Sequence, residues 1–140
     1  MNCRSQTSEH KHLLIQMYQY FETLRAKPLN QADMAKFYNP KVTMIINGQK
    51  VAQGFDGFYK HFKMMLEKTK RFKFIFPRHA MLAEGNRIAA QYNIELQEAG
   101  KLKLLHVIAI FTFKKGKILK WDEVVSSSSA NALKLNRHDQ

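Results

Sequence analysis

Apolar side chains in the first part of the chain recur at the three- and four-residue spacing of amphipathic helices. Ser8 suits the N-cap of a first helix, which the break at Pro28 would end. Its apolar positions are Leu13, Leu14, Met17, Phe21 and Leu24. A second helix is predicted between Asn30, which with Asp33 resembles a capping box, and the helix-breaking Pro40. Two helices therefore precede any strand.

The next segment combines a hairpin with a third helix. Residues 42–46 have an extended pattern, and Asn47-Gly48 is a strong hairpin signal because both residues tolerate a positive φ. A third amphipathic helix is predicted to follow, with Asp56 as its cap and Leu66 near its end.

From Phe72 onward the apolar period changes to two, which is the period of a β-strand. Turn signals divide this half into four strands of a meander: Glu84-Gly85-Asn86, Ala99-Gly100 and Lys115-Gly116. Pro77 cannot donate to a ladder, so the strand predicted over 72–83 should have an edge or a bulge there. The pattern predicts one α+β domain, in which helices and the inner face of a curved antiparallel sheet enclose an apolar pocket.

The register of the last hairpin decides which side chains face that pocket. A three-residue loop over 114–116 would pair Phe113 with Lys117, Phe111 with Leu119, and Ala109 with Trp121. The inner face would then hold Val107, Ala109, Phe111, Phe113, Leu119, Trp121, Glu123 and Val125. A two-residue loop would break this assignment, because a slip of one residue moves every side chain across the sheet.

Glu123 is the only acidic residue on the predicted inner face. A carboxylate in an apolar pocket has a raised pKa, which suits it to acid or base catalysis. Near a strand end, the same side chain could instead reach water or pair with a lysine. Trp121 fits a core position, and its indole N–H, which needs a partner, also makes it a candidate ligand contact.

The opposite face is too apolar for a sheet surface that meets water, since it carries Leu104, Ile108 and Ile110. A second copy of the same sheet is the economical cover, so we predict a homodimer through this outer face. His106 and Asp122 would be diagonal neighbours there and would serve as polar residues of the interface.

The composition fits one domain with one core: 140 residues, of which 45% are hydrophobic. The net charge of +12 reflects 23 basic and 11 acidic residues. Basic residues cluster over 60–73 and 114–120, and a solvated surface explains these clusters better than nucleic-acid binding. Cys3 is the single cysteine, which excludes an internal disulfide, and the histidines lack metal-ligand spacing, so no metal or cofactor is predicted. The polar first residues and the absence of a long apolar run predict a cytoplasmic protein without membrane spans.

Three segments resemble the nuclear transport factor 2-like superfamily, and within it the SnoaL-like group. Residues 33–42 resemble its second helix running into a strand, 84–89 its "EGDRVA" hairpin, and 111–122 its "FRFxDGKIxExWD" ending. The resemblance implies a cone-shaped barrel with a deep pocket, often a dimer. The superfamily includes ketosteroid isomerases, polyketide cyclases, dehydratases, epoxide hydrolases and non-enzymatic binding domains. The chain is thus predicted to comprise a flexible N-terminus (1–7), a SnoaL-like domain (8–125) and a tail (126–140) whose polar composition predicts a loose terminus, with a short helix possible over 130–135.

The resemblance transfers few catalytic residues. Tyr20 aligns with the helix-1 tyrosine that donates to the oxyanion in ketosteroid isomerases. The two aspartates of those enzymes would fall near Ile46 and at Ala109, so the resemblance does not imply steroid isomerisation by their mechanism. Glu123 corresponds approximately to a last-strand carboxylate of several members, and Asp122 is the alternative if the hairpin register is shifted.

Two hypotheses follow. The first is a domain that binds a small apolar ligand, with an isomerase, cyclase or dehydratase activity that uses Glu123 as base and Tyr20 as hydrogen-bond donor. Its predicted ligand contacts are Phe21, Tyr92, Ala109, Phe111, Phe113 and Trp121. The second is a non-catalytic binding or protein-interaction module that uses its basic surface.

Overall fold

The computed structural model describes residues 3–24, 27–69 and 71–129. Helix α1 (Cys3–Thr23) begins earlier than the predicted cap at Ser8, so most of the predicted N-terminal arm is helical. Within the described ranges, no helix is long and apolar enough to cross a membrane. The helix considered over 130–135 lies outside the described residues.

The predicted second helix is reduced to little more than one turn. A 3₁₀ turn, η1 (Gln31–Asp33), leads into α2 (Met34–Phe37), and the Asn30 side chain accepts a hydrogen bond from the Ala32 N–H. Strand β1 (Tyr38–Ile46) follows at once, so Pro40 lies in a strand and does not end a helix. This is possible because 39–42 have no ladder partner in the neighbouring strands, where the missing N–H of proline would matter.

The hairpin and the third helix form where the sequence predicts them. Asn47 (φ 50°) and Gly48 (φ 82°) turn the chain from β1 into β2 (Gln49–Gln53). Helix α3 (Gly54–Lys68) begins before Asp56, which lies in the first turn and forms an ion pair with Lys60. Asp56 therefore does not act as the cap.

The remaining strands are β3 (Arg71–Ile75), β4 (Met81–Glu84), β5 (Arg87–Glu98), β6 (Lys101–Lys114) and β7 (Lys117–Ser129). The sheet order is β2-β1-β7-β6-β5-β3, with β4 also pairing with β5. The single strand predicted over 72–83 is wrong, because the segment with Pro77 separates β3 from β4. The β1–β7 pair is parallel and the other pairs are antiparallel.

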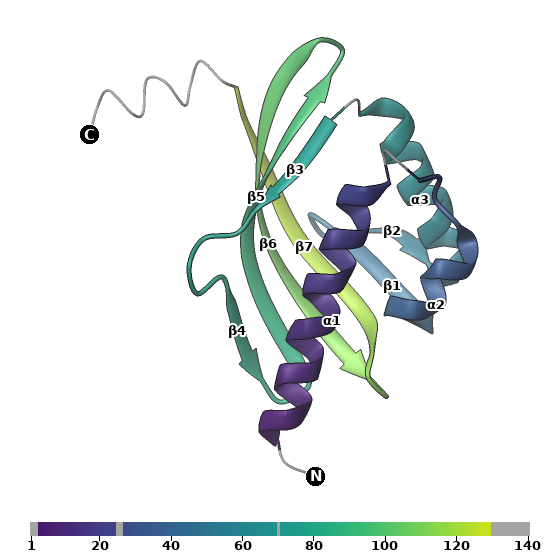
Figure 1. Cartoon of the computed structure of the whole chain (residues 1–140), viewed down its shortest axis with the longest axis vertical. Helices are drawn as coiled ribbons and strands as arrows, with labels where there is room; N and C mark the ends of the chain where they lie inside the picture. The colour runs from purple at the N-terminus through teal and green to yellow at the C-terminus, as the bar shows by residue number, and fades with distance from the viewer. Residues whose placement is uncertain (1–2, 25–26, 70, 130–140) are drawn as a thin grey trace.

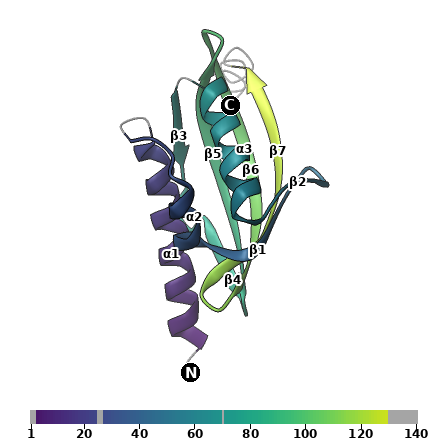
Figure 2. The same ribbon diagram turned by 90° about the vertical axis from the view of Figure 1, so that its right-hand side faces the viewer.

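Helices α1 and α3 pack on the concave side of the curved sheet, α1 against β3 and α3 against β1 and β2 (Figures 1 and 2). Both helices turn their apolar side chains toward this side. The core includes the fully buried Leu14 and Met17 from α1, Phe58 from α3, and Phe111 from β6. The helices therefore enclose the space above the inner face of the sheet.

The register predicted for the last hairpin is wrong, although most of the predicted inner face is right. Lys114 pairs with Lys117 across a two-residue turn, and Phe113 pairs with Ile118. Thr112 then pairs with Lys120, which leaves Leu119 in a bulge. Because the bulge adds one residue, it reverses the effect of the shorter turn from Trp121 onward. Ile118, not Leu119, is the buried residue.

On the outer face, the predicted neighbours His106 and Asp122 are not adjacent, because Asp122 lies opposite Ile110. The two ring nitrogens of His106 instead contact Asn93 Oδ1 at 2.9 Å and Ser128 Oγ at 2.7 Å. Strand β7 runs to Ser129, past the domain end predicted at residue 125. The homodimer stays a prediction.

A candidate ligand cavity with one carboxylate

A cavity of about 190 Å³ lies between α1, α3 and the inner face of the sheet. Its lining is mostly apolar and includes Phe21, Leu24, Met44, Ile46, His61, Phe62, Met65, Leu66, Thr69, Phe72, Phe74, Tyr92, Ile94, Leu96, Leu105, Trp121, Glu123 and Val125. Helix periodicity supplies one wall and strand alternation the other. A molecule held there would be surrounded by aromatic and aliphatic carbon.

Glu123 is the only carboxylate among the described residues that line this cavity. The alternation restored by the bulge at Leu119 turns its side chain inward. Burial raises the pKa of the Glu123 carboxyl to about 7, and the nearby Trp121 indole partly offsets the rise. The backbone there is fixed, since the Glu123 carbonyl accepts the Asn47 N–H at 2.9 Å. At neutral pH, Glu123 can therefore both accept and give up a proton.

Trp121 presents a buried donor in the cavity wall. The residue is 4% exposed, and its Nε1–H forms no hydrogen bond with other described residues. The indole lies close enough to Glu123 to lower the carboxyl pKa, but not in hydrogen-bonding geometry. A buried N–H without a partner costs about 1–3 kcal/mol. A ligand with an acceptor oxygen would satisfy it.

Tyr92 contributes a buried hydroxyl to the wall. The Tyr18 hydroxyl donates to the Tyr92 hydroxyl at 2.5 Å, so the Tyr92 proton is left to point elsewhere. Burial raises the pKa of both tyrosines, and the charge of Glu123 acts in the same direction. Tyr92 therefore remains a neutral hydroxyl donor beside the carboxylate.

Tyr20 is placed away from the cavity. Its hydroxyl donates to the Asp33 carboxylate at 2.7 Å, and burial together with Asp33 raises its pKa to about 12. The structure thus does not bring Tyr20 and Glu123 together, contrary to the predicted pairing. Asp122 faces the other side of the sheet, so it is no substitute for Glu123.

The predicted ligand contacts divide into two groups. Phe21, Tyr92 and Trp121 line the cavity. Ala109, Phe111 and Phe113 are buried in the core behind it: Phe111 packs against Trp121 with ring centroids 5.0 Å apart, and Phe113 stacks on His10 at 4.0 Å. These three support the wall and do not form its surface.

Sequence reasoning missed His61 and Thr69, both contributed by α3 and the residues just after it. Burial lowers the pKa of His61, so its imidazole is neutral at pH 7. Its spacing with Met65 on the apolar face of the helix was the available signal. Among the residues that the structure describes, no group of His, Cys, Asp and Glu could hold a metal ion.

The model of the SnoaL-like domain matches residues 17–121, which include the C-terminal part of α1, the whole of α3 and the first part of β7 up to Trp121. This chain belongs to the SnoaL-like domain family. The match ends just before Glu123. A comparison with curated proteins gives no significant match for this SnoaL-like domain.

Solved structures share the fold of this SnoaL-like domain at low sequence identity. A protein from Jannaschia sp. CCS1, provisionally described as a SnoaL-like polyketide cyclase, gives a TM-score of 0.71 at 12% identity over 85% of this chain and 86% of that one. An NTF2-like protein of unknown function from Exiguobacterium sp. 255-15 gives 0.70 at 17% identity over 81% and 98%. TerC, co-crystallised with polyporic acid, gives 0.68 at 11% identity over 91% and 96%. These likenesses establish the α+β cone fold.

Proposed function

We propose that this SnoaL-like domain binds a small, mostly apolar carbonyl compound in the cavity and that Glu123 transfers a proton at the carbon next to the carbonyl. The observation that carries the proposal is the single carboxylate of the described cavity wall, whose pKa lies at about 7. A base with a pKa near the ambient pH combines a useful ionised fraction with good proton affinity.

The chemistry assigns a role to each polar group of the wall. The Glu123 carboxylate takes a proton from the carbon beside the carbonyl, the C–H electron pair forms a C=C bond to the carbonyl carbon, and the carbonyl π pair moves onto the oxygen as an enolate forms. Trp121 Nε1–H and the Tyr92 hydroxyl donate to that oxygen, where negative charge develops. Where the ligand carries a C=C bond next to that carbon, the enolate is a dienolate, and return of the proton from Glu123 to the far carbon of that bond completes an isomerisation.

Three observations support a small ligand of this kind. The cavity holds about 190 Å³, so it suits a molecule of one or two fused rings. Aromatic side chains such as Phe62, Phe74 and Trp121 offer flat surfaces to an unsaturated ring. TerC, which shares the fold, was crystallised with polyporic acid, a small molecule.

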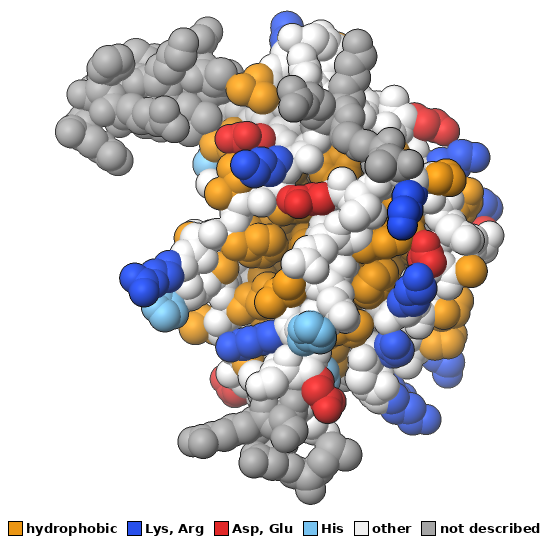
Figure 3. Space-filling model, in the orientation of Figure 1, with side chains coloured by type: hydrophobic (Ala, Val, Ile, Leu, Met, Phe, Trp, Pro, Cys, Tyr) orange, Lys and Arg blue, Asp and Glu red, His pale blue; other side chains and the backbone are white. Residues whose placement is uncertain are grey.

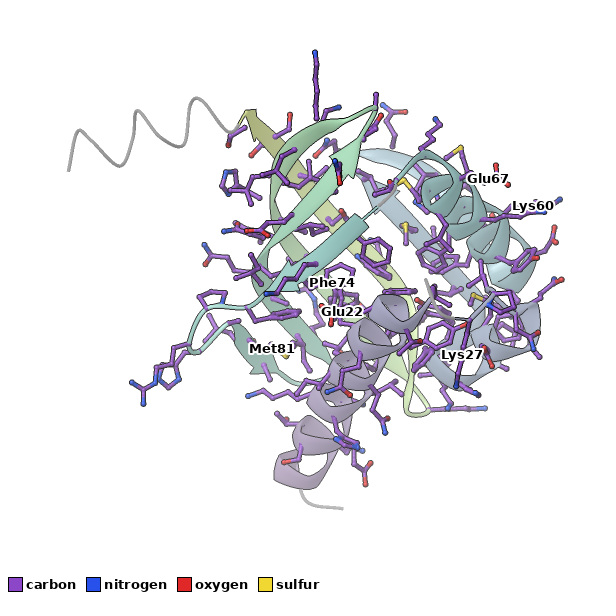
Figure 4. All side chains as sticks on the ribbon, turned by 45° about the horizontal axis from the view of Figure 1, so that its top comes forward. Glu22, Lys27, Lys60, Glu67, Phe74 and Met81 are labelled. Carbon is purple, nitrogen blue, oxygen red and sulfur yellow. The ribbon has the colours of Figure 1, made fainter. Side chains whose placement is uncertain are left out.

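Exchange of the α-hydrogens of 2-tetralone in D₂O, followed by proton NMR, tests the proposal. We expect Glu123→Gln to reduce the protein-catalysed exchange rate by about 100-fold or more. Binding of 2-tetralone should be retained, as measured by quenching of the single tryptophan, Trp121. The matched control is Glu67→Gln, because Glu67 lies on the outer side of α3 (Figure 4) and should not change the rate.

Trp121→Phe separates the donor from the base. Loss of the indole N–H should slow exchange by about 10-fold while the ring continues to fill the wall. Equal exchange rates in wild type and Glu123→Gln would refute the catalytic proposal. Tight binding of 2-tetralone without exchange in the wild type would instead leave a non-catalytic binding domain.

A further inference from the structure

A second cavity, of about 500 Å³, opens on the other side of α1. It lies between that helix and the segment that runs from β3 into β4, and it is lined by Lys11, Ile15, Tyr18, Gln19, Glu22, Phe74, Phe76, His79, Ala80 and Met81. In Figure 3, hydrophobic side chains gather between α1 and the β3–β4 side of the molecule. Only Phe74 also lines the first cavity. Its volume is that of a small-molecule site.

The floor of the second cavity is aromatic and partly open to solvent. The Tyr18 ring packs edge-on against Phe74, with centroids 4.9 Å apart, and against Phe76 at 5.1 Å. Phe76 remains 37% exposed, and Ile15 on the helical wall is 46% exposed. These side chains therefore leave apolar surface uncovered inside a concave site, where an aliphatic chain would bury it.

The α1 wall of the second cavity carries two oppositely charged residues, Lys11 and Glu22, which differ in whether they have a partner. Lys11, Ile15, Gln19 and Glu22 follow one another at helical spacing and form one stripe of α1. Glu22 is already engaged, because its Oε1 accepts the Phe74 N–H at 3.1 Å and ties α1 to β3 (Figure 4). Lys11 is half-buried and forms no ion pair with any residue that the structure describes. The Lys11 ammonium is thus available to pair with an anionic group of a ligand.

His79 adds a second potential donor on the opposite wall. It has a φ of 58°, a conformation that residues other than glycine adopt only when the surrounding chain holds them there. The turn brings the imidazole to the cavity wall, across from α1. The site therefore combines a lysine on the α1 wall and a histidine on the opposite wall with an apolar floor.

We propose that the second cavity binds a free fatty carboxylate. Its carboxylate would form an ion pair with Lys11, while its aliphatic tail lies over Tyr18, Phe74 and Phe76. The Lys11 ammonium favours a carboxylate over a neutral amphiphile. The second cavity shares no catalytic residue with the proposed isomerase site, so a test of one proposal does not decide the other.

Titration of dodecanoate, below its micelle concentration, into protein labelled with ¹³C at the methionine methyl groups tests the proposal. Met81 lines the second cavity, whereas Met44 and Met65 line the first. We expect saturable shifts at Met81 that exceed those at the other two. Shifts centred on Met44 and Met65 would place the carboxylate in the first cavity and overturn the proposal, as would no shift at millimolar dodecanoate.

Charge variants test the role of Lys11. Lys11→Gln should weaken dodecanoate binding by about 10-fold, as expected for loss of one charge-assisted hydrogen bond. Lys63→Gln, which removes an exposed charge outside both cavities, should leave the affinity unchanged. Dodecanol should bind wild type more weakly than dodecanoate. Equal affinities of Lys11→Gln and wild type, or of dodecanol and dodecanoate, would refute the anionic site.

Discussion

Replacing Glu123 with glutamine isolates the cost of holding a carboxylate in the apolar cavity. In the folded protein its pKa is about 7, whereas its ordinary value is 4.5. As the pH rises between these values, the unfolded chain releases the proton while the native carboxyl keeps it. The free energy of unfolding therefore falls through this window and levels off above pH 7. The amide of glutamine does not titrate, so the variant lacks this decline.

The magnitude follows from linkage. Each pH unit between the two pKa values corresponds to about 1.4 kcal/mol, so the full cost is about 3 kcal/mol above pH 7. Between about pH 5 and about pH 8.5, the difference in unfolding free energy should move by about 2.5 kcal/mol in favour of Glu123→Gln. That is a large part of the 5–15 kcal/mol that typically stabilises a domain.

Urea unfolding at a series of pH values, followed by the fluorescence of the single tryptophan, measures the effect. Glu67→Gln is the control and should parallel wild type at every pH. Any fixed cost of the buried amide appears as a constant offset, so the slope carries the information. A difference between wild type and Glu123→Gln that stays constant with pH would show that the carboxyl is not shifted by burial.

Three further predictions concern the bulge in β7, the turn at Asn47 and the outer face of the sheet. Ile118→Ala should lower the free energy of unfolding by about 3 kcal/mol and Leu119→Ala by less than about 1, since only Ile118 is fully buried; similar losses in urea unfolding would contradict the bulge. Asn47→Ala should cost about 2 kcal/mol in the same assay, because the side chain forms two hydrogen bonds with the Val125 backbone and φ is positive. Sedimentation should show a dimer that Ile108→Lys converts to monomer, because Ile108 is 57% exposed on the outer face; a wild-type monomer at micromolar concentration would rule out that interface.

Local signals in the sequence were enough to predict most of the helices and strands. The Asn47-Gly48 dipeptide predicted its hairpin because positive φ is a property of the residues themselves. The regular alternation over 88–97 lies within β5, and the apolar stripe of the first helix faces the core. Three motifs of the chain were also enough for the family, which the match over 17–121 confirms. Glu123 was found as a candidate although the predicted register was wrong, because the bulge at Leu119 restores the predicted alternation from Trp121 onward.

The tertiary structure decided what periodicity left open. A bulge depends on how two strands pair, so no local signal in the sequence shows that Ile118 is buried in the core in place of Leu119. Pro40 is accepted in β1 because of missing partners on neighbouring strands, which the sequence around it does not encode.

The candidate site predicted from the sequence also differs from the site in the structure. Tyr18 and Tyr20 are two positions apart on α1 and point to different sides, and only packing shows that Tyr18 contacts Tyr92 while Tyr20 contacts Asp33. The sequence by itself determined helices and strands, because those follow from backbone preferences and period, whereas the inward orientation of Glu123 depends on the bulge between β6 and β7. Contacts between segments far apart in the chain, such as Tyr18 and Tyr92, decide which hydroxyl lies near that carboxylate. Such contacts also form the second cavity.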